Sequence, residues 1–142
     1  MGGVDRVRNN RRLTLEDAAA FHGHKGPFVV LGYRAGIYAV ETLRPETEFD
    51  LLAEIEIPIK TPYSCILDGI QCSTKCTLGK GNIIVRQAKH VRIKIRNTKS
   101  NKEVSLELNG KYLELFENLE IEKASKIAEE EDIMKLFRIV IG

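Results

Sequence analysis

A strict alternation of apolar and charged residues over positions 91–96 is the feature that most constrains the fold of this chain. Three aliphatic residues alternate there with three basic ones, in the order Val91, Arg92, Ile93, Lys94, Ile95, Arg96. A period of two places the apolar side chains on one face of a β-strand and the charged ones on the other. The segment therefore predicts a sheet with one dry and one wet face, which is typical of antiparallel sheets.

The remaining elements follow from period, caps and breakers. Strands are predicted over 49–59, 83–86 and 103–108, and helices over 15–21, 28–43 and 111–131, with a last short helix from Ile133. Thr14 is the predicted N-cap of the first helix, and Pro27 suits the first turn of the second. The segment 63–80, which holds all three cysteines, is predicted to be irregular. This order indicates an α+β fold, with helices packed on one face of a small, mostly antiparallel (mixed) sheet.

Length and composition bound the class of protein. The 142 residues suit one domain, so we predict a flexible basic arm over 1–12 and a single α+β domain over 13–142. A net charge of +2 gives no argument for a nucleic-acid partner. No apolar run is long enough for a membrane span, and no leader pattern opens the chain. Three cysteines without a disulfide pattern suit a reducing compartment, so we expect a cytoplasmic protein.

His22 and His24 flank Gly23, just before Gly26 and Pro27. Histidines two apart do not share a helix face, so they act together only in a loop or an extended segment. The glycines and the proline supply such a loop, and the helix that follows has free N–H groups at its start. The pair is therefore a candidate for metal binding, and two surface histidines beside a turn is the alternative.

Cys65, Cys72 and Cys76 fall within twelve residues, next to Asp68. Three cysteines cannot form a four-thiolate zinc site, and neither spacing is the short one of a zinc ribbon. A mixed imidazole and thiolate site remains, which suits zinc and also cobalt, nickel or ferrous iron. Buried cysteines that only fill the core are the alternative.

Lys80 lies in a glycine-spaced loop, Gly79 to Gly81, that lacks the spacing of a phosphate-binding Walker loop. It is a candidate for contact with an anionic ligand, or simply part of a tight turn. The general-base signatures of zinc deaminases and zinc proteases are absent. Gly32 and Gly36, four residues apart on the second helix, are predicted to allow close approach of another element.

Two motifs together resemble a known family. The first is Phe21–Pro27 (FHGHKGP) with Leu31–Gly36 (LGYRAG), and the second is Cys65–Gln71 (CILDGIQ) with Thr74–Thr77 (TKCT) and Gly79–Asn82 (GKGN). Both are similar to signatures of the FmdE family, which is named for a component of formylmethanofuran dehydrogenase, and they occur in the same order. The similarity runs from about residue 13 to at least residue 110.

The resemblance implies an α+β core, a homodimer and a bound transition metal, most often Zn²⁺. Carried over by position, the metal ligands are His22, His24, Cys65 and Cys76, with Cys72 as a further candidate. Asp68, Gln71, Thr77 and Lys80 match positions that flank the pocket.

Three departures accompany the resemblance. Gly26 stands where relatives commonly have a cysteine, Lys75 stands where a glycine is usual, and no cysteine follows Cys76 to form the C-terminal zinc domain of many relatives. We therefore expect a short FmdE-like protein that binds metal, as an accessory or metal-handling partner of a molybdenum or tungsten enzyme complex of the formylmethanofuran dehydrogenase type. The alternative is a small metalloenzyme with an open metal site that activates water or a carbonyl. Asp68 would then be the candidate general base and Lys80 the substrate clamp.

Overall fold

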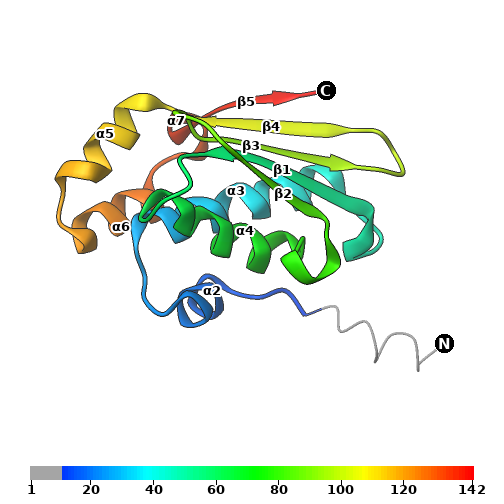
Figure 1. Cartoon of the computed structure of the whole chain (residues 1–142), viewed down its shortest axis with the longest axis horizontal. Coiled ribbons are helices and arrows are strands. Elements are labelled where there is room, and N and C mark those ends of the chain that lie inside the picture. Colours follow the sequence, from blue (N-terminus) through cyan, green and yellow to red (C-terminus); the bar gives the residue numbers. More distant parts are fainter. Residues whose placement is uncertain (1–10) are drawn as a thin grey trace.

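A five-stranded sheet forms one layer of the fold, in the order β2-β1-β3-β4-β5 (Figure 1). The computed structural model describes residues 11–142, so most of the predicted N-terminal arm lies outside the described residues. The strands are β1 (Leu51–Ile57), β2 (Ile83–Gln87), β3 (Arg92–Asn97), β4 (Glu103–Leu108) and β5 (Phe137–Ile141). β1 and β2 run parallel, and the other neighbouring pairs run antiparallel. The sheet is therefore mixed and mostly antiparallel, as predicted.

The helices cover one face of this sheet, which confirms the predicted α+β class (Figure 1). They are α2 (Leu15–His22), α3 (Pro27–Leu43), α4 (Ile66–Thr74), α5 (Gly110–Asn118), α6 (Ile121–Glu130) and α7 (Ile133–Leu136). Three short 3-10 turns accompany them: η1 (Glu48–Asp50), η2 (Tyr63–Cys65) and η3 (Leu78–Lys80). No helix of residues 11–142 has the length and apolar character to cross a membrane.

The helix starts match the predicted caps. Thr14 accepts a hydrogen bond from the Asp17 amide at 3.1 Å, and the Asp17 carboxylate accepts one from the Thr14 amide at 2.8 Å. This reciprocal capping box satisfies two backbone donors at the start of α2. Pro27 occupies the first turn of α3, where its missing N–H costs nothing. The loop that carries His22 and His24 is therefore held between two well-defined helix termini.

Helices α3 and α4 pack so closely that their backbones touch. A Cβ built on Gly32 would lie 2.1 Å from the Ile66 carbonyl oxygen, and one built on Gly69 would lie 2.2 Å from the Val29 carbonyl oxygen. Only glycine fits such a contact. The predicted close approach at Gly32 and Gly36 is thus confirmed, and it brings α4 against the start of α3.

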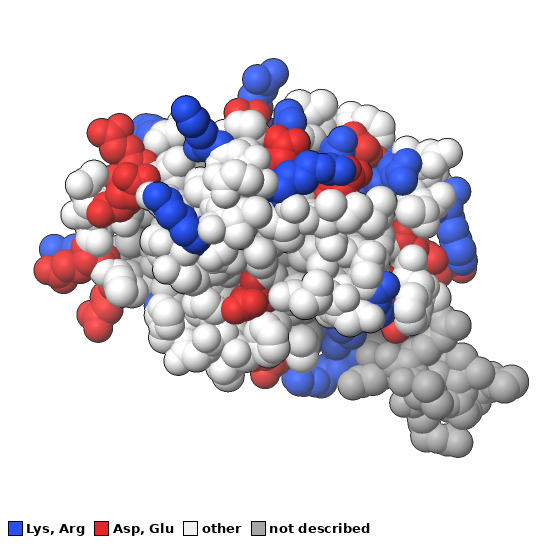
Figure 2. Space-filling view, viewed as in Figure 1, with Lys and Arg blue, Asp and Glu red and all other residues white. Residues whose placement is uncertain are grey.

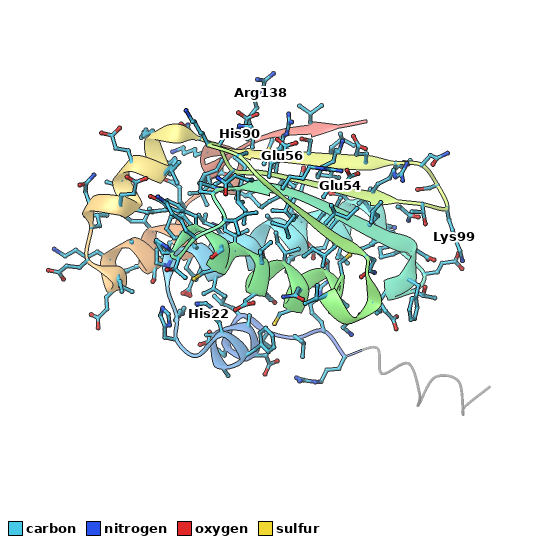
Figure 3. All side chains as sticks on the ribbon, viewed as in Figure 1. His22, Glu54, Glu56, His90, Lys99 and Arg138 are labelled. Carbon is cyan, nitrogen blue, oxygen red and sulfur yellow. The ribbon has the colours of Figure 1, made fainter. Side chains whose placement is uncertain are left out.

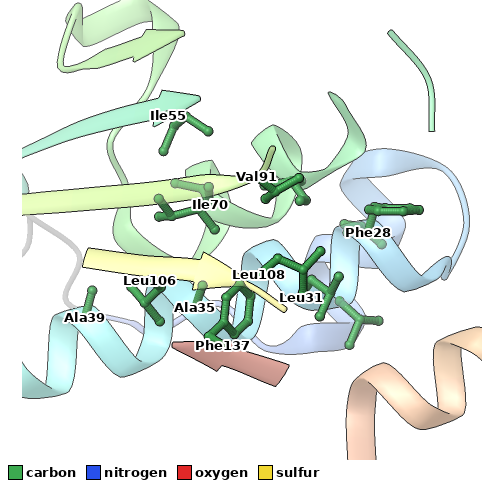
Figure 4. Close-up of a cluster of buried hydrophobic side chains, with 14 of the residues drawn as sticks. Phe28, Leu31, Ala35, Ala39, Ile55, Ile70, Val91, Leu106, Leu108 and Phe137 are labelled. Atoms are coloured by element: carbon green, nitrogen blue, oxygen red, sulfur yellow. The ribbon is translucent and has the colours of Figure 1, made fainter. Parts of the chain in front are cut away.

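The core lies between the sheet and these helices (Figure 4). Fully buried aliphatic side chains from both layers meet there, among them Leu31, Ile55, Ile70, Ile95 and Leu106. The apolar residues of the alternating segment 91–96 all face this core. Burial of this apolar face accounts for the register of the strands.

The opposite face of the sheet carries interleaved charges (Figures 2 and 3). Acidic side chains on β1 pair with basic ones on both neighbouring strands: Glu54 with Arg86 at 3.0 Å, and Glu56 with Arg92 at 2.9 Å. His90 also contacts Glu56, at 2.6 Å. The basic residues of 86–96 thus belong to a solvated face with its own carboxylates.

Three predictions of local structure were wrong. The segment 63–80 holds helix α4, which the sequence hides because Ser73 and Thr74 are poor helix formers whose hydroxyls bond back to the Gly69 and Ile70 carbonyls. The helix predicted over 111–131 is two helices, separated where Leu119 and Glu120 adopt extended backbone. Strand β5 at 137–141 was missed, since five terminal residues carry too little pattern.

Candidate functional site

His22, His24 and Cys65 line one cavity, although the second histidine and the cysteine are 41 positions apart in the sequence. The cavity has a volume of about 400 Å³ and is also bounded by the start of α3 and by helix α5. We call it the site cavity. Its other lining residues are Gly26, Pro27, Phe28, Val29, Pro62, Tyr63, Phe116, Glu117, Leu119 and Ile121. Two separate motifs of the sequence therefore meet at one place.

His22 is held by Asp68. Its Nδ1 lies 2.6 Å from Asp68 Oδ2, and its side chain is only 11% exposed (Figure 3). A carboxylate only accepts hydrogen bonds, so Nδ1 carries the proton and donates. The Nε2 atom of His22 is then left with a lone pair. Carboxylate–histidine pairs of this kind orient metal-binding imidazoles in proteins.

His24 lies beside His22, with a distance of 4.9 Å between ring centroids. Gly23 makes this possible, because it ends α2 with a φ of 113°, a conformation that favours glycine. A Cβ built on Gly26 would lie 3.3 Å from His24 Nε2. The position at which the resemblance implies a cysteine therefore faces this imidazole.

Cys65 comes from the other motif, at the end of η2 and directly before α4. Burial, with a smaller contribution from the nearby Asp68 carboxylate, raises the pKa of its thiol. The thiol is therefore protonated at neutral pH in the absence of a cation. Metal binding there would release a proton, as is general for thiolate ligands.

The other predicted site residues lie outside the site cavity. Cys72 is buried within α4, and Cys76 is fully buried near the Ala53 backbone, where burial raises the pKa of its thiol. Lys80 donates to Thr77 Oγ1 at 2.8 Å within its own loop. The structure thus brings together His22, His24, Cys65 and Asp68, and does not bring Cys72, Cys76 or Lys80 to them.

The donor set fits a transition metal in chemistry. Two imidazoles and a thiolate suit Zn²⁺, Co²⁺ or Ni²⁺. Within residues 11–142, however, no three His, Cys, Asp or Glu side chains are arranged so that they could hold an ion as they stand. Coordination by His22, His24 and Cys65 would require their side chains to converge.

Helix α6 anchors the histidine loop, a role that the sequence did not reveal. The Lys25 ammonium lies 2.7 Å from Glu129 Oε1, and Ser125 Oγ donates to the Lys25 carbonyl oxygen at 3.1 Å. Arg34 donates to the Ala128 carbonyl at 2.8 Å and so caps the end of α6. These partners are 94 positions apart along the chain, and no local pattern links residues at that separation.

Aromatic side chains form the apolar wall of the site cavity, which the sequence did not predict either. The Phe28 ring meets those of Tyr63 and Phe116 edge to face, at centroid distances of 5.4 and 6.2 Å. Phe116 reaches this place because the chain breaks between α5 and α6. The wall gives the cavity an apolar side opposite its imidazoles.

The comparisons with known proteins agree with this architecture. The family described as "FmdE, Molybdenum formylmethanofuran dehydrogenase operon" matches residues 21–141. The fold is similar to the crystal structure of an FmdE-like protein of tungsten formylmethanofuran dehydrogenase from Syntrophus aciditrophicus. That match has a TM-score of 0.58 and 20% identity, and it covers 90% of this chain and 69% of the other. At that identity it shows the fold alone.

One further relative has a different name. A probable S-adenosyl-L-methionine-binding protein from Archaeoglobus fulgidus is 36% identical over 92 residues. The match covers 59% of this chain and 24% of the relative, so it spans about a quarter of that protein's length.

Proposed function

The chain belongs to the FmdE family, and from that premise we propose that it is a metal-binding protein whose ligands are His22, His24 and Cys65. One observation carries the proposal: both motifs of the sequence line the same cavity, and Asp68 occupies the Nδ1 side of His22. Zn²⁺ is the ion that we expect, since imidazole with thiolate is among its preferred donor sets. When bound, the ion would supply a Lewis acid at the site cavity.

The residues around the ligands have defined roles in this proposal. Asp68 fixes the ring orientation and tautomer of His22. Lys25 and helix α6 fix the loop that carries His24. The site cavity beside the ligands excludes bulk water on its apolar side and leaves room for a small molecule.

The biological role that we propose is accessory. The family is described by a molybdenum formylmethanofuran dehydrogenase operon, which supports a link to an enzyme complex of that type. Metal handling for such a complex needs ligands but no catalytic machinery, and the site cavity provides ligands. We propose a homodimer in the cytoplasm, and three free cysteines suit that compartment.

A metalloenzyme is the second candidate. Three protein ligands leave one position of a tetrahedral ion open, and the adjoining cavity of about 400 Å³ is large enough for a substrate. Asp68 remains the candidate general base, although it is engaged with His22. Lys80 lies outside the site cavity, so a substrate in that cavity would not meet it.

Metal content tests the proposal. Purified protein is loaded with Zn²⁺ or Co²⁺, dialysed and analysed for bound metal. We expect about one ion per chain, lost in both His22→Ala and Cys65→Ala and retained in the matched controls His90→Ala and Cys72→Ala. Retention in the first pair would contradict the ligand assignment.

Coordination then separates the two candidate functions. X-ray absorption of the Zn²⁺ form counts protein ligands: four favour storage or structure, whereas three with one water favour catalysis. Titration with S-adenosyl-L-methionine, taken from the name of the A. fulgidus relative, tests one organic ligand of the same cavity.

A further inference from the structure

Tyr63 and Glu117 separate the site cavity from a second cavity. The Tyr63 hydroxyl donates to Glu117 Oε1 at 3.0 Å, and both residues line both cavities. The second cavity has a volume of about 310 Å³. Its other lining residues are Pro58, Lys60, Gln87, Ala88, Lys89 and Leu113. One pair of side chains, joined by one hydrogen bond, thus divides a longer trough.

The trough lies at a position that favours ligands. Strands β1 and β2 are parallel, and their carboxyl ends point to the side of the molecule on which α5 lies (Figure 1). The second cavity is bounded by the residues that directly follow these two strands. In sheets with parallel strands, ligands bind outside the carboxyl ends, where the chain leaves the sheet.

The second cavity offers positive charge that is not engaged by a carboxylate. The Lys60 ammonium lies 5.9 Å from the centre of the Tyr63 ring. Among residues 11–142, no carboxylate pairs with Lys60 or Lys89. The neighbouring Arg86 and His90, by contrast, both pair with glutamates of β1. Glu117 is the acidic residue of the lining, and it accepts the Tyr63 hydrogen bond.

The two ends of the trough therefore differ in chemistry. Phe28, Phe116 and Ile121 make the site cavity apolar on one side, and the imidazoles of His22 and His24 lie on its other side. Two ammonium groups flank the second cavity. Glu117 is exposed and Tyr63 is half-buried, so their hydrogen bond can open without disturbing the core.

We propose that the two cavities form one site for an elongated organic anion. Its apolar or aromatic head occupies the site cavity, and its carboxylate or phosphate end lies between Lys60 and Lys89. The inference deepens the proposed function, because it rests on the site cavity being the ligand site and gives the class of ligand. The ion, when bound, would meet the head of this ligand.

Chain length and charge of the ligand provide the test. The probes are ω-phenylalkanoates of increasing length, the matching ω-phenylalkyl phosphates, and the uncharged primary amides. Each is titrated by calorimetry into the full chain at low ionic strength, with and without Zn²⁺. The variants are Lys60→Gln/Lys89→Gln and, as control, Lys94→Gln, which removes a charge from the outer face of β3.

We expect the long acids or phosphates to bind about fivefold more tightly than the amides, which corresponds to about 1 kcal/mol. The double variant should abolish this preference, the control should keep it, and the shortest acid should not show it. The tighter of the two anion series identifies the preferred end group. An equal preference at every length, an unchanged preference in the double variant, or no binding of any probe would overturn the inference.

Zinc content of the same samples separates this inference from the metal proposal. The double variant should keep the zinc content of the unmodified chain. A chain that binds no zinc, yet prefers long anions in a lysine-dependent manner, would refute the metal proposal alone. A chain that binds zinc at His22 without this preference would refute the inference alone.

Discussion

Replacement of Gly69 by alanine should destabilise the protein, because the new methyl group has no space. Its Cβ would lie 2.2 Å from the Val29 carbonyl oxygen and 2.5 Å from the Tyr33 amide nitrogen. Both atoms belong to the backbone of α3, so no side chain can rotate away. Helices α3 and α4 must therefore separate, at the point where their contact is closest.

The magnitude follows from two opposing effects. Overpacking of a core costs about 1–3 kcal/mol, and rigid backbone neighbours place Gly69→Ala at the upper end of that range. The higher helix propensity of alanine returns about 1 kcal/mol. The net loss is then about 2 kcal/mol, or roughly 6–10 °C in melting temperature for a chain of this size.

Urea unfolding followed by circular dichroism measures this loss, since the chain has no tryptophan for fluorescence. The matched control is Gly110→Ala at the start of α5, where a Cβ would meet nothing within 4 Å. The control should leave the free energy of unfolding unchanged or raise it by about 0.5 kcal/mol. If Gly69→Ala were as stable as the control, the close helix contact would be refuted.

Three further substitutions test single contacts. Arg34→Met removes the cap at the end of α6 and should lower the free energy of unfolding by about 1–3 kcal/mol; an unchanged urea midpoint would contradict the capping role. Asp68→Ala should weaken Zn²⁺ affinity by about 10- to 100-fold while His22 remains, which competition with a chelator measures; wild-type affinity would mean that the carboxylate does not orient the imidazole. Asp50→Asn should destabilise at neutral pH. Backbone hydrogen bonds, first from Thr47 and then from Glu46, together with the nearby Lys99 ammonium, hold the pKa of Asp50 below its usual value. A depressed pKa contributes stability above the unfolded value of about 3.9 that is lost as the pH falls through the folded value. The difference between the two proteins should therefore be constant from about pH 5 to 7 and shrink in more acidic urea titrations, and a difference independent of pH would refute this assignment.

The sheet could be predicted from the sequence because its apolar face repeats with period two. The alternation from Val91 to Arg96 predicted β3, and similar alternation predicted β1 and β4. Helix α4 could not be predicted in this way, because its contact face consists of Gly69 and Ser73, which have low helix propensity in isolation. Their small size is required by the neighbouring helix, and that requirement is visible only in three dimensions.

The candidate site divides along the same line. His22, His24 and Cys65 were identified from their residue types and spacing, and the structure places all three at one cavity. The sequence could not show that Cys76 faces the core or that Asp68 bonds to His22. Lys75 illustrates a departure with a physical meaning: it ends α4 with a φ of 62°, a conformation that favours the glycine usual in the family.

Metal stoichiometry tests the central proposal most directly. The unmodified chain and the variants His22→Ala, Cys65→Ala, His90→Ala and Cys72→Ala are loaded with Zn²⁺ under identical conditions, and bound zinc is measured by elemental analysis. We predict about one zinc per chain in the unmodified protein and both controls, and none in the two cavity variants. An unmodified chain without zinc, or cavity variants that keep it, would contradict the proposed site.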